Sequence, residues 1–221
     1  MSRAAEAGSA ARKMDGIYRR QRYIYDATRR YYLFGRDRLI AELDAPTGGA
    51  VLEIGCGTAR NLIKAARGYP HAVFFGLDVS EEMLRTARAS LARHGLARQI
   101  TVAAGDARSF DSDGLFNLRQ IDRIFISYAL SMIPGWEEVV RNAARCLAPG
   151  GSLHIVDFGD FARYPAIFQR MQRAWLGWFS VTPIPDFERR IERLAAELGL
   201  RVATKRLHGG YAILAKLEHP R

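Results

Sequence analysis

The stretch VLEIGCGT, residues 51–58, decides the fold of this chain. An apolar run with β-branched residues leads directly into two closely spaced glycines, which is typical of a buried strand that ends in a tight turn. From this stretch outward, strand and helix patterns alternate. Strands are predicted at 50–56, 72–78, 99–106, 121–128 and 152–158, and helices at 59–68, 80–94, 136–147 and 186–199. Ser80 is expected to cap the second of these helices.

The C-terminal part departs from this alternation. RVATKRL at 201–207 and YAILAKLE at 211–218 flank the residues HGG, and this pattern predicts a closing hairpin. Strand–helix alternation favours a parallel sheet with helices on both faces, whereas a hairpin adds an antiparallel strand. We therefore expect an α/β fold with a doubly wound, mostly parallel sheet of seven strands, which binds its ligands at the carboxyl ends of the strands.

Length and composition indicate an ordinary globular protein. The chain has 221 residues, enough for one core, and 48% of them are hydrophobic and 25% charged. These values exclude a mostly disordered or collagen-like chain. No apolar run approaches the roughly 18 residues of a membrane span, and the first residues lack the apolar segment of a signal peptide. Two cysteines, Cys56 and Cys146, form no disulfide framework, so we expect a cytoplasmic protein.

The sequence divides into three parts. Residues 1–13 are small and polar and are expected to form a disordered tail. Residues 14–49 are predicted to be an N-terminal amphipathic helical segment that is interrupted at Gly35. Residues 50–221 form the main domain, in which an aromatic-rich insertion at 159–185 has no assignable pattern.

Basic residues gather in the N-terminal segment. The net charge is +10, and residues 12–38 alone contain nine basic and three acidic side chains. A coding bias toward arginine would also raise the total, so the position of the charge is more informative than its size. A clustered basic surface indicates a polyanionic partner, either nucleic acid or an anionic membrane face.

The side chains at the strand ends indicate the chemistry of the ligand. Asp78 ends the second strand and suits the hydroxyls of a ribose. Asp106 ends the third and suits an exocyclic amine better than a phosphate. A dinucleotide site would need glycine where the chain has Arg60, and Glu53 before the turn would oppose a pyrophosphate. A cationic ligand with ribose and adenine but no phosphate fits these features, whereas a nicotinamide-dependent oxidoreductase fits them poorly.

The ordered series VLEIGCGT, GLDVS, GDA, FISYAL and LAPGG resembles the class I S-adenosylmethionine-dependent methyltransferases over residues 50–157. The resemblance implies S-adenosylmethionine as cofactor, S-adenosylhomocysteine as product, and no metal. Ala59 departs from the family, which usually has a third glycine there. We expect this alanine to be tolerated, because alanine favours a helix start and adds only a methyl group.

The resemblance also implies roles for individual residues. Gly55 and Gly57 would pass beneath the methionine part, Asp78 would hold the ribose, Asp106 would bond the adenine amine, and Glu53 would support the glycine loop. A structural cap is the alternative for Glu53, and Cys56 is expected to be a small buried filler. The predicted cofactor-binding residues are Glu53, Gly55, Gly57, Thr58, Asn61, Asp78, Val79, Met83, Asp106, Ala107 and Ser127.

A narrower resemblance concerns the methyl acceptor. MDGIYRRQRYIYDATRRYYLFGRDRLI at 14–40, SYALSMIP at 127–134 and VDFGD at 156–160 resemble the small bacterial phosphatidylethanolamine N-methyltransferases and the similar enzymes of betaine lipids. This implies stepwise methylation of phosphatidylethanolamine, with diacylglyceryl-homoserine as the alternative acceptor. An RNA or small-molecule methyltransferase, or a basic nucleic-acid-binding module, also fits the charge.

A lipid acceptor makes sense of the N-terminal side chains. Arginines off the aromatic stripe can bind lipid phosphates, and tyrosine faces attract a quaternary ammonium product. Tyr25, next to Asp26, is the candidate catalytic residue that orients the amine or relays its proton, whereas His154 is expected to be a packed strand residue. We expect an anionic membrane surface as partner on the inner face, with no nucleic acid and no obligate protein partner. The predicted substrate-binding residues are Tyr18, Tyr25, Arg29, Tyr32 and Arg36.

Overall fold

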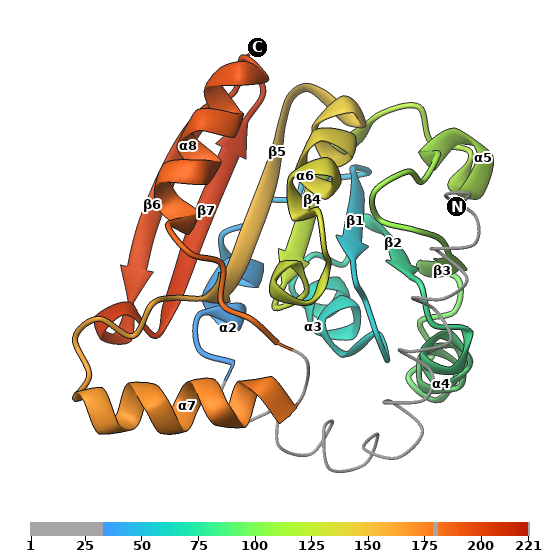
Figure 1. Ribbon diagram of the computed structural model, residues 1–221. Coiled ribbons are helices and arrows are strands. Elements are labelled where there is room, and N and C mark those ends of the chain that lie inside the picture. Colours follow the sequence, from blue (N-terminus) through green and yellow to red (C-terminus); the bar gives the residue numbers. More distant parts are fainter. Residues whose placement is uncertain (1–32, 179–180, 221) are drawn as a thin grey trace, which may run out of the picture.

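The computed structural model describes residues 33–178 and 181–220 of the chain. Its centre is one seven-stranded sheet with the strand order β3-β2-β1-β4-β5-β7-β6 (Figure 1). Strands β1 to β5 run parallel, and β7 pairs antiparallel with both β5 and β6. The expected doubly wound sheet with a closing hairpin is therefore confirmed. The strands are β1 Ala50–Ile54, β2 Val73–Asp78, β3 Ile100–Ala104, β4 Ile121–Ser127, β5 Leu147–Phe158, β6 Arg201–Leu207 and β7 Ala212–Glu218.

Helices cover both faces of this sheet. The alternation within β1 shows why: Val51 packs into the core beneath α2, α3 and α4, whereas Leu52 packs into the core beneath α6 and α8. Both side chains are fully buried. The helices are α2 Arg36–Ala41, α3 Arg60–Gly68, α4 Glu81–Arg93, α5 Ser112–Phe116, α6 Trp136–Arg145, α7 Ala166–Trp178 and α8 Phe187–Glu197, with short 3₁₀ turns η1 Leu130–Met132 and η2 His208–Gly210.

The carboxyl ends of the parallel strands lie along one edge of the sheet. In Figure 1 this edge points toward α7, which crosses below it. Helix α7 comes from the insertion at 159–185 that the sequence left unassigned. Its buried residue Leu176 belongs to the core on the α2 side, so the helix is anchored to the domain.

Two predicted boundaries need correction at the start of β5. The helix predicted at 136–147 ends at Arg145, and the strand predicted from 152 begins at Leu147. Residues 149–151 lie inside the strand, because Leu147 pairs with Ile121, with an irregularity in the register before Arg123. The five-residue helix α5 was not predicted either.

The N-terminal helical segment is described only from Leu33 onward. Gly35 has a φ of 86°, a left-handed conformation that glycine adopts without strain, and α2 begins directly after it. This fits the interruption expected at Gly35. The predicted tail at 1–13 and the helix over residues 14–32 lie outside the described residues.

Candidate active site

The turn after β1 is shaped by its two glycines. Gly55 and Gly57 have φ values of 75° and 52°. The backbone N–H groups of Gly55 and Cys56 both donate to the carbonyl oxygen of Leu77 in β2, at 2.7 and 3.0 Å. Within the described part of the chain, no heavy atom lies within 4 Å of a Cβ placed on Gly57. The turn is therefore fixed to the sheet, with open space over Gly57 through which a ligand can approach the backbone.

Ala59 contradicts one expectation about this turn. The residue is not inside α3 but caps its N-terminus, with φ 64° and ψ 20°, and it is fully buried. Helix propensity therefore gives it no advantage, because the left-handed conformation costs an alanine about 1–2 kcal/mol. The turn forms nonetheless, so the missing third glycine lowers stability without abolishing the loop.

Asp78 connects the glycine turn with the following strand end. Its Oδ2 accepts a hydrogen bond from the Gly57 N–H at 2.7 Å, and its Oδ1 accepts from the Ser80 N–H at 3.0 Å. Ser80 caps α4 as predicted, since its hydroxyl accepts from the Met83 N–H at 3.3 Å. Met83 is buried and Val79 is half-buried. The carboxylate thus lies where the sequence placed it, next to the turn.

Glu53 is fully buried in β1. Its Oε1 accepts a hydrogen bond from the Asn61 Nδ2 at 2.7 Å, which joins the strand to the first turn of α3.

Desolvation raises the pKa of the Cys56 thiol well above its usual range, and the charges of Asp78 and Glu53 raise it further. Cys56 is therefore an inert buried thiol, in agreement with its expected role as a filler.

Asp106 is held by an arginine that sequence reasoning missed. The Arg108 Nη2 donates to the Oδ2 of Asp106 at 2.6 Å, and the Arg108 Nε and N–H donate to its Oδ1 at 3.0 and 2.9 Å. These bonds lower the pKa of Asp106, so the carboxylate stays ionised. Asn142 fixes the same loop by donating to the carbonyl oxygens of Ala107 and Phe110. The signal in the sequence was the Asp-x-Arg spacing at a strand end.

A small cavity of about 30 Å³ brings several predicted residues together. The hydroxyl of Ser127 is buried there and has no hydrogen-bond partner among the residues that the structure describes. A ligand group that accepts or donates a hydrogen bond would satisfy it. The cavity is lined by Leu33, Arg36, Gly55, Cys56, Thr58, Arg60, Asn61 and Ser127.

The residues of this region fit S-adenosylmethionine. The glycine turn leaves room over its backbone, and Asp78 offers a carboxylate at the end of β2. The Ser127 hydroxyl has no hydrogen-bond partner within residues 33–178 and 181–220. Asp106 lies at the next strand end with its oxygens oriented by Arg108. The predicted roles of the single residues toward this cofactor stay predictions.

The predicted acceptor residues are described only in part. Arg36 lines the cavity beside Gly55 and Ser127, although the two positions are 19 and 91 residues further along the chain. Its Nε also lies 3.2 Å from the Asp37 carboxylate. Sequence reasoning missed a second link to this segment: the Tyr128 hydroxyl donates to the Phe34 carbonyl oxygen at 2.5 Å. The other predicted acceptor residues, Tyr18, Tyr25, Arg29 and Tyr32, lie outside the described residues.

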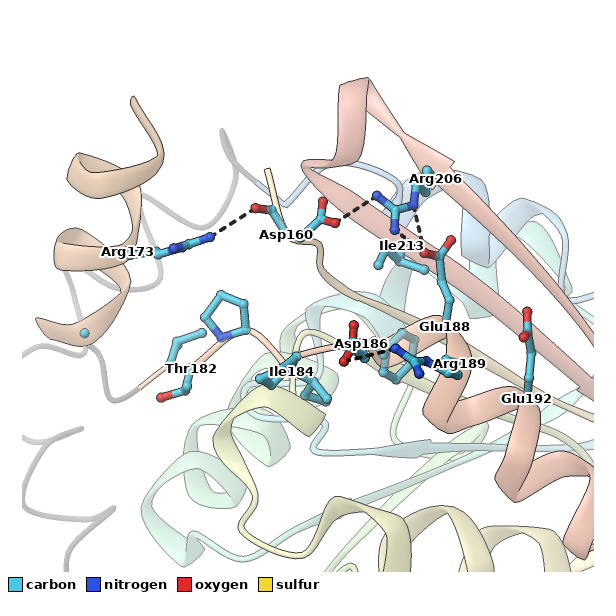
Figure 2. A pocket seen from close by; sticks show the side chains of 15 residues that line it. Asp160, Arg173, Thr182, Ile184, Asp186, Glu188, Arg189, Glu192, Arg206 and Ile213 are labelled. Carbon is cyan, nitrogen blue, oxygen red and sulfur yellow. Dashed lines mark hydrogen bonds and ion pairs between the residues drawn. The ribbon is translucent and has the colours of Figure 1, made fainter. Parts of the chain in front are cut away.

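A second, larger cavity of about 950 Å³ lies between α7 and the start of α8, away from the predicted cofactor residues. Figure 2 shows Asp160 between Arg173 and Arg206. Asp160 accepts from Arg206 at 2.9 Å through its carboxylate and from Arg173 at 3.4 Å through its carbonyl oxygen. Arg206 also pairs with Glu188 of α8. These contacts tie the segment that carries α7 to β6 and α8.

Within residues 33–178 and 181–220, no group of three or more His, Cys, Asp or Glu side chains is arranged to hold a metal ion. In the same two ranges, no helix is both long and apolar enough to cross a bilayer.

Comparison with known proteins agrees with this geometry. Residues 51–151 match the family model described as a methyltransferase domain. The chain is 34% identical over 173 residues to a phosphatidylethanolamine N-methyltransferase of Cereibacter sphaeroides, covering 76% of this chain and 77% of that protein. It is 29% identical over 138 residues to a ribosomal RNA small subunit methyltransferase C of Pseudomonas aeruginosa (strain LESB58), covering 62% of this chain and 40% of that protein.

A solved structure shows the same fold. Phosphoethanolamine N-methyltransferase 2 of Haemonchus contortus, in complex with S-adenosyl-L-methionine, superposes with a TM-score of 0.69 at 16% identity. The superposition covers 85% of this chain and 53% of that one. Given the extent of the similarity to the Cereibacter sphaeroides protein, and the glycine turn and strand-end acids described above, the chain belongs to the class I S-adenosylmethionine-dependent methyltransferases.

Proposed function

We propose that the protein methylates the amine of phosphatidylethanolamine at an anionic membrane surface, stepwise toward phosphatidylcholine. One observation carries the proposal: Leu33 and Arg36 line the same cavity as Gly55 and Ser127. An acceptor held by the basic, aromatic segment that precedes these residues would therefore meet the methyl donor at the proposed cofactor site. The name of the Cereibacter sphaeroides relative supports the same acceptor.

The strand-end residues would hold the cofactor. Asp78 would accept the ribose hydroxyls while it keeps the Gly57 N–H, because a carboxylate oxygen has more than one lone pair. Asp106 would accept the adenine amine with the carboxylate that Arg108 orients. Glu53 would add negative charge below the sulfonium while Asn61 keeps it in place.

S-adenosylmethionine supplies a methyl group that is already activated for displacement by a neutral amine. The protein therefore needs mainly to position the amine, exclude water and let one proton leave before each transfer. We assign positioning to the N-terminal segment. Arg36 would hold the lipid phosphate through its guanidinium, since this planar group binds phosphate with two parallel hydrogen bonds. Tyr25 keeps its proposed role toward the amine.

Helix α7 supports a membrane surface as partner. Ile167, Met171 and Trp178 lie on its outer face and are 68%, 66% and 79% exposed. Their spacing of four and seven residues places them on one face of a helix. Residues 161–178 contain arginines but no Asp or Glu. An exposed apolar face with basic neighbours is suited to the interface of an anionic bilayer.

A methyl-transfer assay tests the proposal. Purified protein with radiolabelled S-adenosylmethionine is given vesicles that contain phosphatidylethanolamine, and the lipid extract is counted. Parallel samples contain vesicles with diacylglyceryl-homoserine or ribosomal RNA. We expect label in phosphatidylethanolamine, first as the monomethyl and then as the dimethyl and trimethyl lipid. Label in homoserine lipid or RNA, with none in phosphatidylethanolamine, would overturn the proposed acceptor.

A further inference from the structure

Tyr128 has a left-handed backbone conformation at the carboxyl end of β4. It follows β4 directly, its φ is 55°, and its side chain is only 1% exposed. A bulky residue with positive φ is strained, and such residues gather where function needs a fixed geometry. The turn brings Ala129 next to the glycine loop, since a Cβ on Gly55 would lie 2.6 Å from the Ala129 Cβ.

Strand β5 holds this strained turn in place. The Tyr128 N–H donates to the Val156 carbonyl oxygen at 2.8 Å. Asp157 is 2% exposed, and its Oδ2 accepts from the Ser131 N–H at 3.0 Å while its Oδ1 accepts from the Phe158 N–H at 2.8 Å. A buried carboxylate that accepts backbone N–H groups fixes the loop strongly, because breaking these bonds would leave it unsatisfied. The direction of the Tyr128 side chain is thus set by β5.

That side chain reaches back to the N-terminal segment. The Tyr128 hydroxyl donates to the Phe34 carbonyl oxygen at 2.5 Å, and its ring lies edge-on to Phe158 with centroids 4.6 Å apart. Phe34 stands between the two residues of this segment, Leu33 and Arg36, that line the cofactor cavity. Ser127, the neighbour of Tyr128, lines the cavity as well. The dipeptide Ser127-Tyr128 therefore contacts both the cavity and the segment.

We propose that Tyr128 is a positioning residue for methyl transfer. Its hydroxyl fixes the backbone of the N-terminal segment at Phe34, so that an acceptor held by this segment is presented in line with the methyl donor. The nature of the acceptor in this inference rests on the proposed function. The position of the segment rests only on the contacts of Tyr128, Asp157 and Phe34.

The chain offers a matched control for this bond. The Tyr69 hydroxyl donates to the carbonyl oxygens of Ile40 and Ala41 at 3.0 and 2.8 Å. Tyr128 thus binds the chain just before α2, and Tyr69 binds the last two residues of α2, each by donating its hydroxyl to backbone carbonyls. The Tyr69 hydroxyl also accepts from the Asp44 N–H at 3.2 Å. Tyr69 does not line the cavity. Tyr69→Phe therefore removes the same kind of bond from the other end of this short helix without touching the site.

The test compares Tyr128→Phe, Tyr69→Phe and the unaltered protein. We expect Tyr128→Phe to lower kcat on phosphatidylethanolamine vesicles about tenfold, because a small misplacement of reacting groups is costly. The dissociation constant of S-adenosylmethionine, measured by calorimetry, should change less than twofold. Tyr69→Phe should leave both quantities within twofold. In an Asp157→Asn background, Tyr128→Phe should lower kcat less than in the unaltered protein, since both act through one loop.

Each result decides the matter. Equal kcat values for the two tyrosine variants, or a loss in Tyr128→Phe that comes entirely from weaker cofactor binding, would overturn the inference. If the unaltered protein does not methylate phosphatidylethanolamine, the proposed function fails, and hydrogen exchange of the cofactor-bound protein then tests the position of the segment. Faster exchange at residues 33–39 in Tyr128→Phe but not in Tyr69→Phe supports it, and equal rates contradict it.

Discussion

The region proposed to bind the cofactor (the cofactor half) and the region proposed to hold the acceptor (the acceptor half) are built differently. In the cofactor half, local patterns mark the site: Asp78 binds Ser80 and Asp106 binds Arg108 at the ends of β2 and β3. The turn after β1 is marked by its two glycines, although its backbone also binds Leu77 and Asp78 of β2. In the acceptor half, α7 and the segment around Phe34 are held by contacts across long stretches of chain, such as Tyr128 with Phe34. Local bonds leave motifs in a sequence, whereas distant contacts leave few. The residues of the cofactor half could therefore be predicted from the sequence, whereas the contacts of the acceptor half required the structure.

Removing residues 1–32 should have the largest effect and tests this division directly. The truncation keeps Leu33, Phe34 and Arg36, which line the cavity or bind Tyr128. We expect activity on phosphatidylethanolamine vesicles to fall at least about a hundredfold, because positioning of the acceptor supplies much of the rate. Cofactor affinity should change less than threefold by calorimetry.

A longer truncation, of residues 1–35, is the sharper control. It also removes the Phe34 carbonyl that Tyr128 binds, and it should weaken cofactor binding as well as activity. Full vesicle activity after removal of residues 1–32 would show that the acceptor half does not include the N-terminal segment.

Asp78→Ala should have the next largest effect. It removes a carboxylate proposed to bind the ribose and also leaves the N–H groups of Gly57 and Ser80 without their acceptor. We expect cofactor affinity to fall about a hundredfold, as for loss of about 3 kcal/mol from a charge-assisted bond. The protein should also unfold at a lower urea concentration, because Asp78 braces the turn through these two bonds. The sequence did not show this structural role.

Asp122 provides a matched substitution, because its bond lies at the start of β1, whereas the glycine turn follows the end of β1. Asp122 accepts from the Ala50 N–H at 2.9 Å, at the start of β1. Asp122→Ala should lower stability and leave cofactor affinity within twofold. If the two variants bind cofactor equally well, Asp78 has only a structural role.

The prediction of the fold from the sequence was accurate where patterns are local. All seven strands and the capping of α4 by Ser80 were expected, because alternation and capping act within a few residues. Helix α7 escaped prediction because apolar residues lie on both of its faces: Leu176 is buried in the core while Trp178 is exposed. A helix with two apolar faces has no single stripe to read. Tyr128 escaped for a different reason, since nothing local marks its partner Phe34.

The outer face of α7 gives a smaller prediction for the acceptor half. Replacing both Met171 and Trp178 by Ser should weaken binding to anionic vesicles about tenfold or more, because burying each side chain contributes roughly 1.5–3 kcal/mol. This loss should persist at high salt, which screens arginines but not apolar contacts. Cofactor affinity should not change.

Leu115 provides the comparison for this surface. It is also exposed, at 37%, but lies on α5, which packs against β3 at one end of the sheet, away from α7 (Figure 1). Leu115→Ser should leave vesicle co-sedimentation unchanged. Equal effects of the two changes would mean that α7 has no special part in docking.

Ala59→Gly should have the smallest effect, and its sign is the informative part. Ala59 is a place in the cofactor half where a local expectation was wrong, since it holds φ 64° rather than starting the helix. Glycine relieves about 1–2 kcal/mol of strain but adds about 0.4–1 kcal/mol of freedom to the unfolded chain, so we expect a net stabilisation of about 0.5–1 kcal/mol. The urea midpoint should rise. Ala65→Gly, a buried site inside the same helix α3, should shift it in the opposite direction, because glycine weakens a helix interior. If Ala59→Gly also lowered the midpoint, strain at the turn would not be what the missing glycine costs this protein.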